Sequence, residues 1–158
     1  MKIAIVNDQM IAVEALRRAL ALDTKYEVIW VAYNGVQAVE LAFKQRPDVI
    51  LMDLMMPVMD GVEATKRIMQ QSPCAIIIVT SDTDKHDSRV FEAMGYGALD
   101  AVNTPTFSGN RQSLEPLFRK IYNVGLLVGA IDKRNNMTHQ VNALNTPLVK
   151  TLIAIGAS

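Results

Sequence analysis

The chain has 158 residues, half of them apolar, which is about the size of one domain with a full hydrophobic core. Sixteen basic residues balance sixteen acidic ones, so no general positive charge is available for binding nucleic acid or a membrane surface. The single cysteine, Cys74, excludes an internal disulfide and fits a reducing compartment. The first apolar run, residues 3–6, lacks the long apolar core of a signal peptide, and no run reaches the roughly 18 residues that span a bilayer. We therefore expect a cytoplasmic protein that binds no nucleic acid and inserts into no membrane.

Short apolar runs alternate with amphipathic stretches along the first 125 residues. The runs with the length and β-branched content of strands are Ile3–Val6, Val28–Val31, Val49–Met52, Ile76–Thr80 and Ala98–Val102. Apolar residues at helical spacing follow each run, in chain order Ala12, Leu16 and Leu20, then Val36, Val39 and Phe43, then Val62, Ile68 and Met69, then Phe91 and Met94, then Leu114, Leu117, Phe118 and Ile121. Most of the strand-like runs are continuously apolar, as strands buried on both faces are. The pattern predicts an α/β fold, doubly wound, in which helices cover both faces of a parallel sheet.

Polar residues stand at the carboxyl ends of the predicted strands. Asn7 and Asp8 follow the first strand, Asp53 follows the third, Thr80 ends the fourth and Thr104 follows the fifth. Right-handed crossovers bring these ends to one edge of the sheet, where ligands bind in such folds. Two carboxylates that meet there repel each other unless a cation lies between them, and hard oxygen ligands with water suit Mg²⁺.

Asp8 also has a simpler explanation, which is equally consistent with the sequence. An aspartate directly before a predicted helix is a common N-cap. Asp53 is followed by a Met-Met-Pro turn and has no helix close by to cap. Of the two carboxylates, Asp53 is therefore the better candidate for a chemical role.

The segment 53–61 reads Asp-Leu-Met-Met-Pro-Val-Met-Asp-Gly, and it resembles the phosphoacceptor loop of two-component response-regulator receiver domains. Other features fall in the family order: Val-Asn-Asp at 6–8, Thr80 after the fourth strand, and Gly-Tyr-Gly-Ala at 95–98. The resemblance covers residues 1–125. It implies a receiver domain with the flavodoxin-like, CheY-like fold, in which five parallel strands lie in the order 2-1-3-4-5.

The resemblance also implies roles for residues at the strand ends. Asp53 is the expected phosphoacceptor, which takes a phosphoryl group from a phosphohistidine of a histidine kinase. Asp8, Asp53 and the backbone carbonyl of Met55 are expected to hold Mg²⁺ or another divalent cation, with Asn7 acting through a water. Thr80 is expected to hydrogen-bond a phosphoryl oxygen and to move on phosphorylation, which is the usual switch of the family.

Three positions depart from the family pattern. Asn7 stands where the family usually has an acid, Thr104 where it has a lysine before the proline of strand five, and Ala101 where it has an aromatic switch residue. Thr104 can hydrogen-bond a phosphoryl group but cannot pair with its charge. One anion and one cation are lost together, so the charge balance of the pocket is partly kept. We expect phosphorylation to survive with altered rates.

The residues after the receiver-like part carry a second resemblance. Residues 126–148 are expected to form a helix extension and an asparagine-rich linker, and residues 149–158 a strand. The segment 150–158 reads Lys-Thr-Leu-Ile-Ala-Ile-Gly-Ala-Ser, which resembles the first strand and nucleophile turn of CheB-type protein-glutamate methylesterases. Ser158 is the nucleophile by this resemblance. Its histidine and carboxylate partners are missing, so we expect a chain truncated at the start of the catalytic domain, without esterase activity.

The receiver-like part most resembles the methylesterase of Wsp-type surface-sensing pathways, on residues 6–8, 12–20 and 102–105. The implied function is a receiver that is phosphorylated on Asp53 and regulates a C-terminal methylesterase acting on chemoreceptor-like proteins. The implied partners are a histidine kinase, the chain's own methylesterase domain and a methyl-accepting receptor. A dimer through the fourth helix, fifth strand and fifth helix is also compatible with the resemblance.

Other functions fit the sequence less well, with one alternative left open. Asn7 and Thr104 somewhat favour an atypical receiver that docks partners without being phosphorylated. A phosphatase of the haloacid dehalogenase type needs a second aspartate two residues after the first, and that position is Met55. No Gly-x-Gly-x-x-Gly motif follows the first predicted strand, which excludes a dinucleotide-binding fold.

Overall fold

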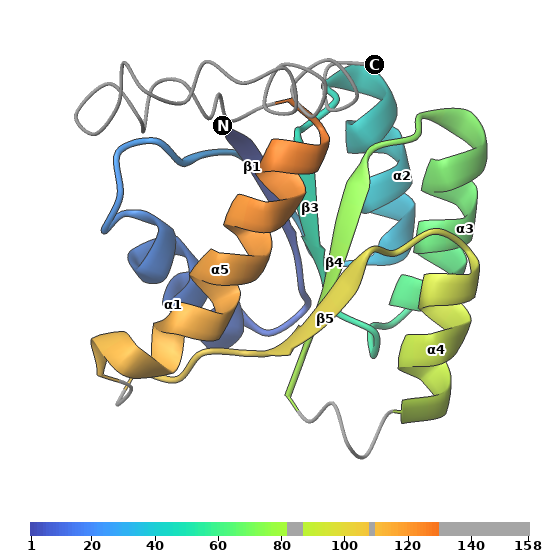
Figure 1. Ribbon diagram of the computed structural model, residues 1–158. Coiled ribbons are helices and arrows are strands. Elements are labelled where there is room, and N and C mark those ends of the chain that lie inside the picture. Colours follow the sequence, from blue (N-terminus) through green and yellow to red (C-terminus); the bar gives the residue numbers. More distant parts are fainter. Residues whose placement is uncertain (82–86, 108–109, 130–158) are drawn as a thin grey trace.

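The structure is a computed structural model that describes residues 1–81, 87–107 and 110–129. Strands and helices alternate along the chain (Figure 1). In chain order they are β1 (Lys2–Val6), α1 (Met10–Leu20), β2 (Glu27–Ala32), α2 (Gly35–Lys44), β3 (Val49–Met52), α3 (Gly61–Gln71), β4 (Ala75–Thr80), α4 (Asp87–Gly95), β5 (Asp100–Asn103) and α5 (Arg111–Leu127). All the strands are parallel, in the order β2-β1-β3-β4-β5. The predicted α/β fold and strand order are confirmed.

Helices cover both faces of the sheet, with α1 and α5 on one face and α2, α3 and α4 on the other (Figure 1). Each face has its own hydrophobic core. Successive residues of β1 point into opposite cores: Ala4 and Val6 into the one under α2–α4, Ile3 and Ile5 into the one under α1 and α5. Because both faces are covered, β3 and β4 are buried at every position, which explains their continuously apolar sequences.

Two helices, α2 and α4, bury small residues and leave large apolar residues exposed. In α2 the buried residues include Ala38 and Ala42, whereas Phe43 is 74% exposed. In α4 Ala93 is buried and Phe91 is 67% exposed. Small side chains allow a helix to pack closely against its neighbours, and the large residues that point another way are then left at the surface. The predicted helices are present, and of the apolar residues at helical spacing in α2, Val39 packs against the core while Phe43 does not.

The fifth strand begins two residues later than predicted, at Asp100 instead of Ala98. The N–H of Ala98 still donates to the carbonyl of Ala93, so it belongs to the end of α4. Gly97 has a φ of 119°, a conformation that glycine adopts easily at a helix end. This turn delays the start of pairing with β4.

Residues 130–158 lie outside the described residues, and with them most of the predicted linker, the predicted last strand and Ser158. None of the helices within the described ranges has the length and apolar character needed to cross a membrane.

Candidate functional site

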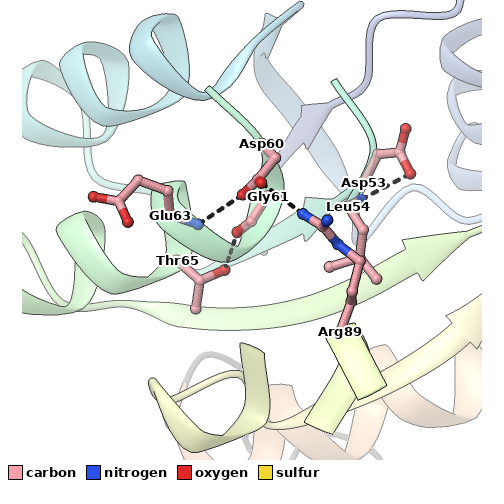
Figure 2. Close-up of polar contacts among 7 residues, drawn as sticks. All are labelled: Asp53, Leu54, Asp60, Gly61, Glu63, Thr65 and Arg89. Carbon is pink, nitrogen blue, oxygen red and sulfur yellow. Dashed lines mark hydrogen bonds and ion pairs between the residues drawn. The ribbon is translucent and has the colours of Figure 1, made fainter. Parts of the chain in front are cut away.

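Asp53 lies directly after β3 and beside the end of β1. Val6 and Met52 are partners in these neighbouring strands, and the N–H of Asp53 donates to the carbonyl of Val6 at 2.9 Å. The side chain of Asp53 is nearly buried, and its Oδ1 accepts a hydrogen bond from the N–H of Leu54 at 2.8 Å (Figure 2). The carboxylate singled out from the sequence is therefore held in a fixed orientation at the carboxyl edge of the sheet.

Asn7 and Asp8 end β1 at the same edge and differ in exposure. Asn7 is buried, its N–H donates to the carbonyl of Ala32 at 3.0 Å, and its Oδ1 accepts a hydrogen bond from the N–H of Gln9 at 2.8 Å. Asp8 is exposed. Gln9 occupies the N-cap position of α1, and no described side chain caps that helix. The capping explanation for Asp8 is therefore wrong, and Asp8 lies exposed directly after β1.

Thr80 and Thr104 lie next to each other on the β4 and β5 side of the edge. Thr80 ends β4, is 1% exposed and pairs with Asn103 of β5. The N–H of Thr104 donates to the carbonyl of Thr80 at 2.9 Å. Thr104 is partly buried and supplies a hydroxyl but no charge. Ala101, two residues before the end of β5, is partly buried and has no ring that could rotate.

The loop between Asp53 and α3, residues 54–60, folds back against the end of β3. The N–H of Gly61 donates to the carbonyl of Leu54 at 2.8 Å. A Cβ on Gly61 would lie 1.9 Å from the carbonyl oxygen of Asp53. Only glycine fits this close approach, which explains the glycine of the Met-Asp-Gly sequence and fixes the start of α3 against the phosphoacceptor candidate.

The same loop contains a strained residue, Val58. Its φ is 69°, and the N–H of Met59 donates to the carbonyl of Pro57 at 2.8 Å, which makes Val58 the centre of a γ-turn. A β-branched residue rarely adopts positive φ. The first residue of α2 holds the turn in place, because the N–H of Gly35 donates to the carbonyl of Met59 at 2.9 Å. The loop is thus fixed at both ends and stores backbone strain beside the site.

Asp60 connects this loop to two helices (Figure 2). Its Oδ1 accepts a hydrogen bond from the N–H of Glu63 at 2.9 Å and caps α3. Its Oδ2 accepts one from Nη2 of Arg89, in α4, at 2.5 Å. Asp60 belongs to the sequence motif at 53–61, whereas Arg89 was not predicted, because nothing in the sequence distinguishes this arginine from those on the surface.

The donors at this edge fit a magnesium ion. Within the part of the chain that the structure describes, no three His, Cys, Asp or Glu side chains gather closely enough to hold a metal. A site would therefore combine the carboxylates of Asp8 and Asp53 with neutral oxygens, namely the carbonyl of Met55 and water held by Asn7. Mg²⁺ commonly takes one or two carboxylates and keeps several waters. The residue types match that preference.

Comparison with known proteins identifies the family. The response regulator receiver domain family matches residues 3–111. The chain belongs to this family. The receiver resembles the response regulator domain of CheB from Thermotoga maritima, with a TM-score of 0.71 and 32% identity over 78% of this chain and 95% of that one. It also resembles the receiver domain of AraT from Geobacillus stearothermophilus, with a TM-score of 0.65 and 31% identity over 77% of this chain and 92% of that one.

The curated relatives are methylesterases. The chain is 57% identical over 160 residues to protein-glutamate methylesterase/protein-glutamine glutaminase 3 of Pseudomonas aeruginosa. This match covers 100% of the chain and 48% of that protein. It is 61% identical over 131 residues to the protein-glutamate methylesterase/protein-glutamine glutaminase of group 3 operon from Pseudomonas putida. That match covers 82% of the chain and 39% of the relative. The chain thus spans about half the length, or less, of these relatives. The predicted resemblance to CheB-type methylesterases is confirmed.

Proposed function

We propose that the receiver accepts a phosphoryl group on Asp53 from a histidine kinase. The observation that carries this proposal is the nearly buried carboxylate of Asp53 at the end of β3, with Thr80 ending the adjacent strand. The exposed carboxylate of Asp8 at the end of β1 supports it, since it has no role as a helix cap. Membership of the receiver family supports the same role.

The transfer replaces one bond to phosphorus by another. A carboxylate oxygen of Asp53 attacks the phosphorus of a phosphohistidine, and an O–P bond forms as the P–N bond breaks. The electron pair of the broken bond returns to the imidazole ring, which takes up a proton. Such transfers depend mainly on positioning and on neutralising charge.

Each residue at the edge has a proposed part in that transfer. The N–H of Leu54 holds the carboxylate of Asp53 in orientation. The hydroxyls of Thr80 and Thr104 donate hydrogen bonds to phosphoryl oxygens. Asp8 and Asp53, with the carbonyl of Met55, would hold Mg²⁺, which supplies the positive charge that Thr104 cannot.

In a longer protein, we propose that this receiver regulates a C-terminal methylesterase that removes methyl groups from glutamyl esters on methyl-accepting, chemoreceptor-like proteins. The names of the relatives support this reading, and so does the half of their length that the chain leaves uncovered. Ser158 is then the proposed esterase nucleophile. It lies outside the described residues, and the assignment to a Wsp-type pathway stays a prediction.

A mass measurement tests the phosphoacceptor directly. The protein is incubated with a small-molecule phosphodonor and Mg²⁺, and its intact mass is compared with that of Asp53→Ala. Asp48→Asn is the matched control, because Asp48 precedes β3 just as Asp53 follows it, and it accepts a hydrogen bond from the N–H of Lys2. We expect one added phosphoryl group on the wild type and on Asp48→Asn, and none on Asp53→Ala.

A second candidate function is docking without phosphorylation. Thr104 brings no charge to the site, and the α4–β5 side exposes apolar residues: Phe91 at 67%, Leu99 at 46% and Met94 at 39%. A partner or a second copy bound at this face would be retained regardless of the state of Asp53. If Asp53→Ala binds its partner and signals as well as the wild type does, docking is the function and phosphorylation is dispensable.

A further inference from the structure

One ion pair joins the loop that follows Asp53 to α4. Arg89 lies in the first turn of α4, and its Nη2 is 2.5 Å from Oδ2 of Asp60, the last residue before α3. Figure 2 shows the guanidinium reaching from α4 to this end of the loop. At the other end of α4, Lys66 of α3 lies over the ring of Tyr96, 5.4 Å from its centroid. The two contacts fasten α4 to α3 at opposite ends.

Asp60 is closely coupled to Asp53 through the backbone. Gly61, the next residue, donates its N–H to the carbonyl of Leu54 at 2.8 Å and leaves no room for a Cβ against the carbonyl of Asp53. The carboxylate of Asp60 is also fixed by the N–H of Glu63, 2.9 Å from its Oδ1. One short backbone contact therefore lies between Asp53 and Gly61, the residue after Asp60, and the side chain of Asp60 in turn contacts Arg89.

The guanidinium of Arg89 is incompletely satisfied where it lies. Its Nε is buried and has no hydrogen-bond partner among the described residues. A buried donor without an acceptor is unfavourable, so a new acceptor within reach gains free energy by binding it. A guanidinium binds phosphoryl oxygens through two parallel N–H groups. A phosphoryl group carries roughly two negative charges, against one on the carboxylate of Asp60.

We propose that the Arg89–Asp60 ion pair holds the start of α4 in the unphosphorylated receiver, and that phosphorylation of Asp53 draws Arg89 away from Asp60 and loosens α4. This inference rests on the proposed function, because it requires a phosphoryl group on Asp53. Arg89 is a positioning residue, which acts on α4 and takes no part in the transfer. Phosphorylation of Asp53 then lowers the stability of α4, and this decrease is the signal that the receiver passes on.

The first experiment measures amide hydrogen exchange in α4 without phosphorylation. Arg89→Gln removes the cation, and Asp60→Asn removes the anion while keeping an oxygen that can cap α3. Arg67→Gln is the matched control, since it breaks the exposed Arg67–Glu63 pair of α3, whose atoms are 2.9 Å apart.

We expect exchange in α4 to be about fivefold faster in Arg89→Gln and Asp60→Asn, the ratio that corresponds to about 1 kcal/mol for one ion pair. The double variant should match the single variants, because either substitution already removes the whole interaction. Arg67→Gln should leave α4 unchanged. Unaltered exchange in both Arg89→Gln and Asp60→Asn would overturn the proposal.

The second experiment repeats the exchange measurement with phosphodonor and Mg²⁺, with the phosphorylated fraction read from the intact mass. Phosphorylation should accelerate exchange in α4 of the wild type by about the same factor, and should add nothing in Arg89→Gln. A full further increase in phosphorylated Arg89→Gln would show that the signal bypasses the ion pair. If the wild type gains no mass, the proposed function fails and the coupling fails with it, whereas the first experiment still decides whether the pair holds α4.

Discussion

The close fit of Gly61 against the end of β3 can be tested by adding one methyl group. In Gly61→Ala the new Cβ would lie 1.9 Å from the carbonyl oxygen of Asp53 and 2.9 Å from the Cα of Leu54. Carbon–oxygen contacts lie at about 3.3 Å or more, so the backbone has to separate by roughly 1.4 Å. That movement breaks the 2.8 Å hydrogen bond from Gly61 to Leu54 and disturbs the cap that Asp60 places on α3.

The expected loss of stability follows from these terms. One hydrogen bond contributes about 1 kcal/mol, a helix cap about 1 kcal/mol, and overpacking costs about 1–3 kcal/mol. Together they predict a decrease of about 3–5 kcal/mol in the free energy of unfolding. Urea denaturation followed by the fluorescence of Trp30 measures it, since this side chain is buried and donates to the carbonyl of Gln45.

The matched control for this substitution is Gly95→Ala in the last turn of α4. A Cβ there meets nothing within 4 Å, so the change should be neutral or stabilising by up to about 1 kcal/mol. Gly61→Ala should also be phosphorylated more slowly, because the displaced carbonyl belongs to Asp53 itself. A Gly61→Ala protein that is as stable and as readily phosphorylated as the wild type would refute the close approach of Gly61 to the carbonyl of Asp53.

Three further predictions follow from single residues. Val58→Asn should raise the free energy of unfolding by about 1 kcal/mol in urea denaturation, because asparagine tolerates the positive φ and the 84% exposed valine gives up little packing; a loss of stability would contradict backbone strain. Burial raises the pKa of the Cys74 thiol to about 11, so iodoacetamide at pH 8 should label the folded protein far more slowly than the unfolded one. Because this folded-state pKa lies above the ordinary thiol value, the contribution of Cys74 to stability should be lost as the pH rises toward 11, and a Cys74→Ala protein should lack that loss. Thr104→Lys keeps the backbone hydrogen bond to Thr80 and adds a cation, so phosphorylation by a small phosphodonor should be about tenfold faster or more in a mass-detected time course; an unchanged rate would show that residue 104 does not face the phosphoryl group.

The sheet could be predicted from the sequence because its signal is local. Continuous apolar runs of strand length, each followed by residues at helical spacing, are sufficient to indicate a parallel sheet covered on both sides. The faces of α2 and α4 could not be assigned in the same way. Ala38 and Ala93 are buried because they allow close packing, but an alanine in a sequence does not reveal which side of its helix is covered.

The site was predictable to the extent that it depends on strand ends. Asp53 and Thr80 lie where the topology of the sheet must place them, and their types suggest their chemistry. The pairing of Arg89 with Asp60 spans 29 residues and depends on how α4 packs beside α3, which no local pattern records. Val58 was equally hidden, since its positive φ is imposed by the surrounding hydrogen bonds and not by the residue itself.

The central claim is that Asp53 is the residue that becomes phosphorylated. Tandem mass spectrometry of the protein after incubation with a small phosphodonor and Mg²⁺ tests it most directly, because it locates the added group as well as detecting it. We predict one phosphoryl group per chain, placed on Asp53 and absent without Mg²⁺. An unmodified protein under conditions that label an ordinary receiver, or a phosphoryl group on another residue, would contradict this account.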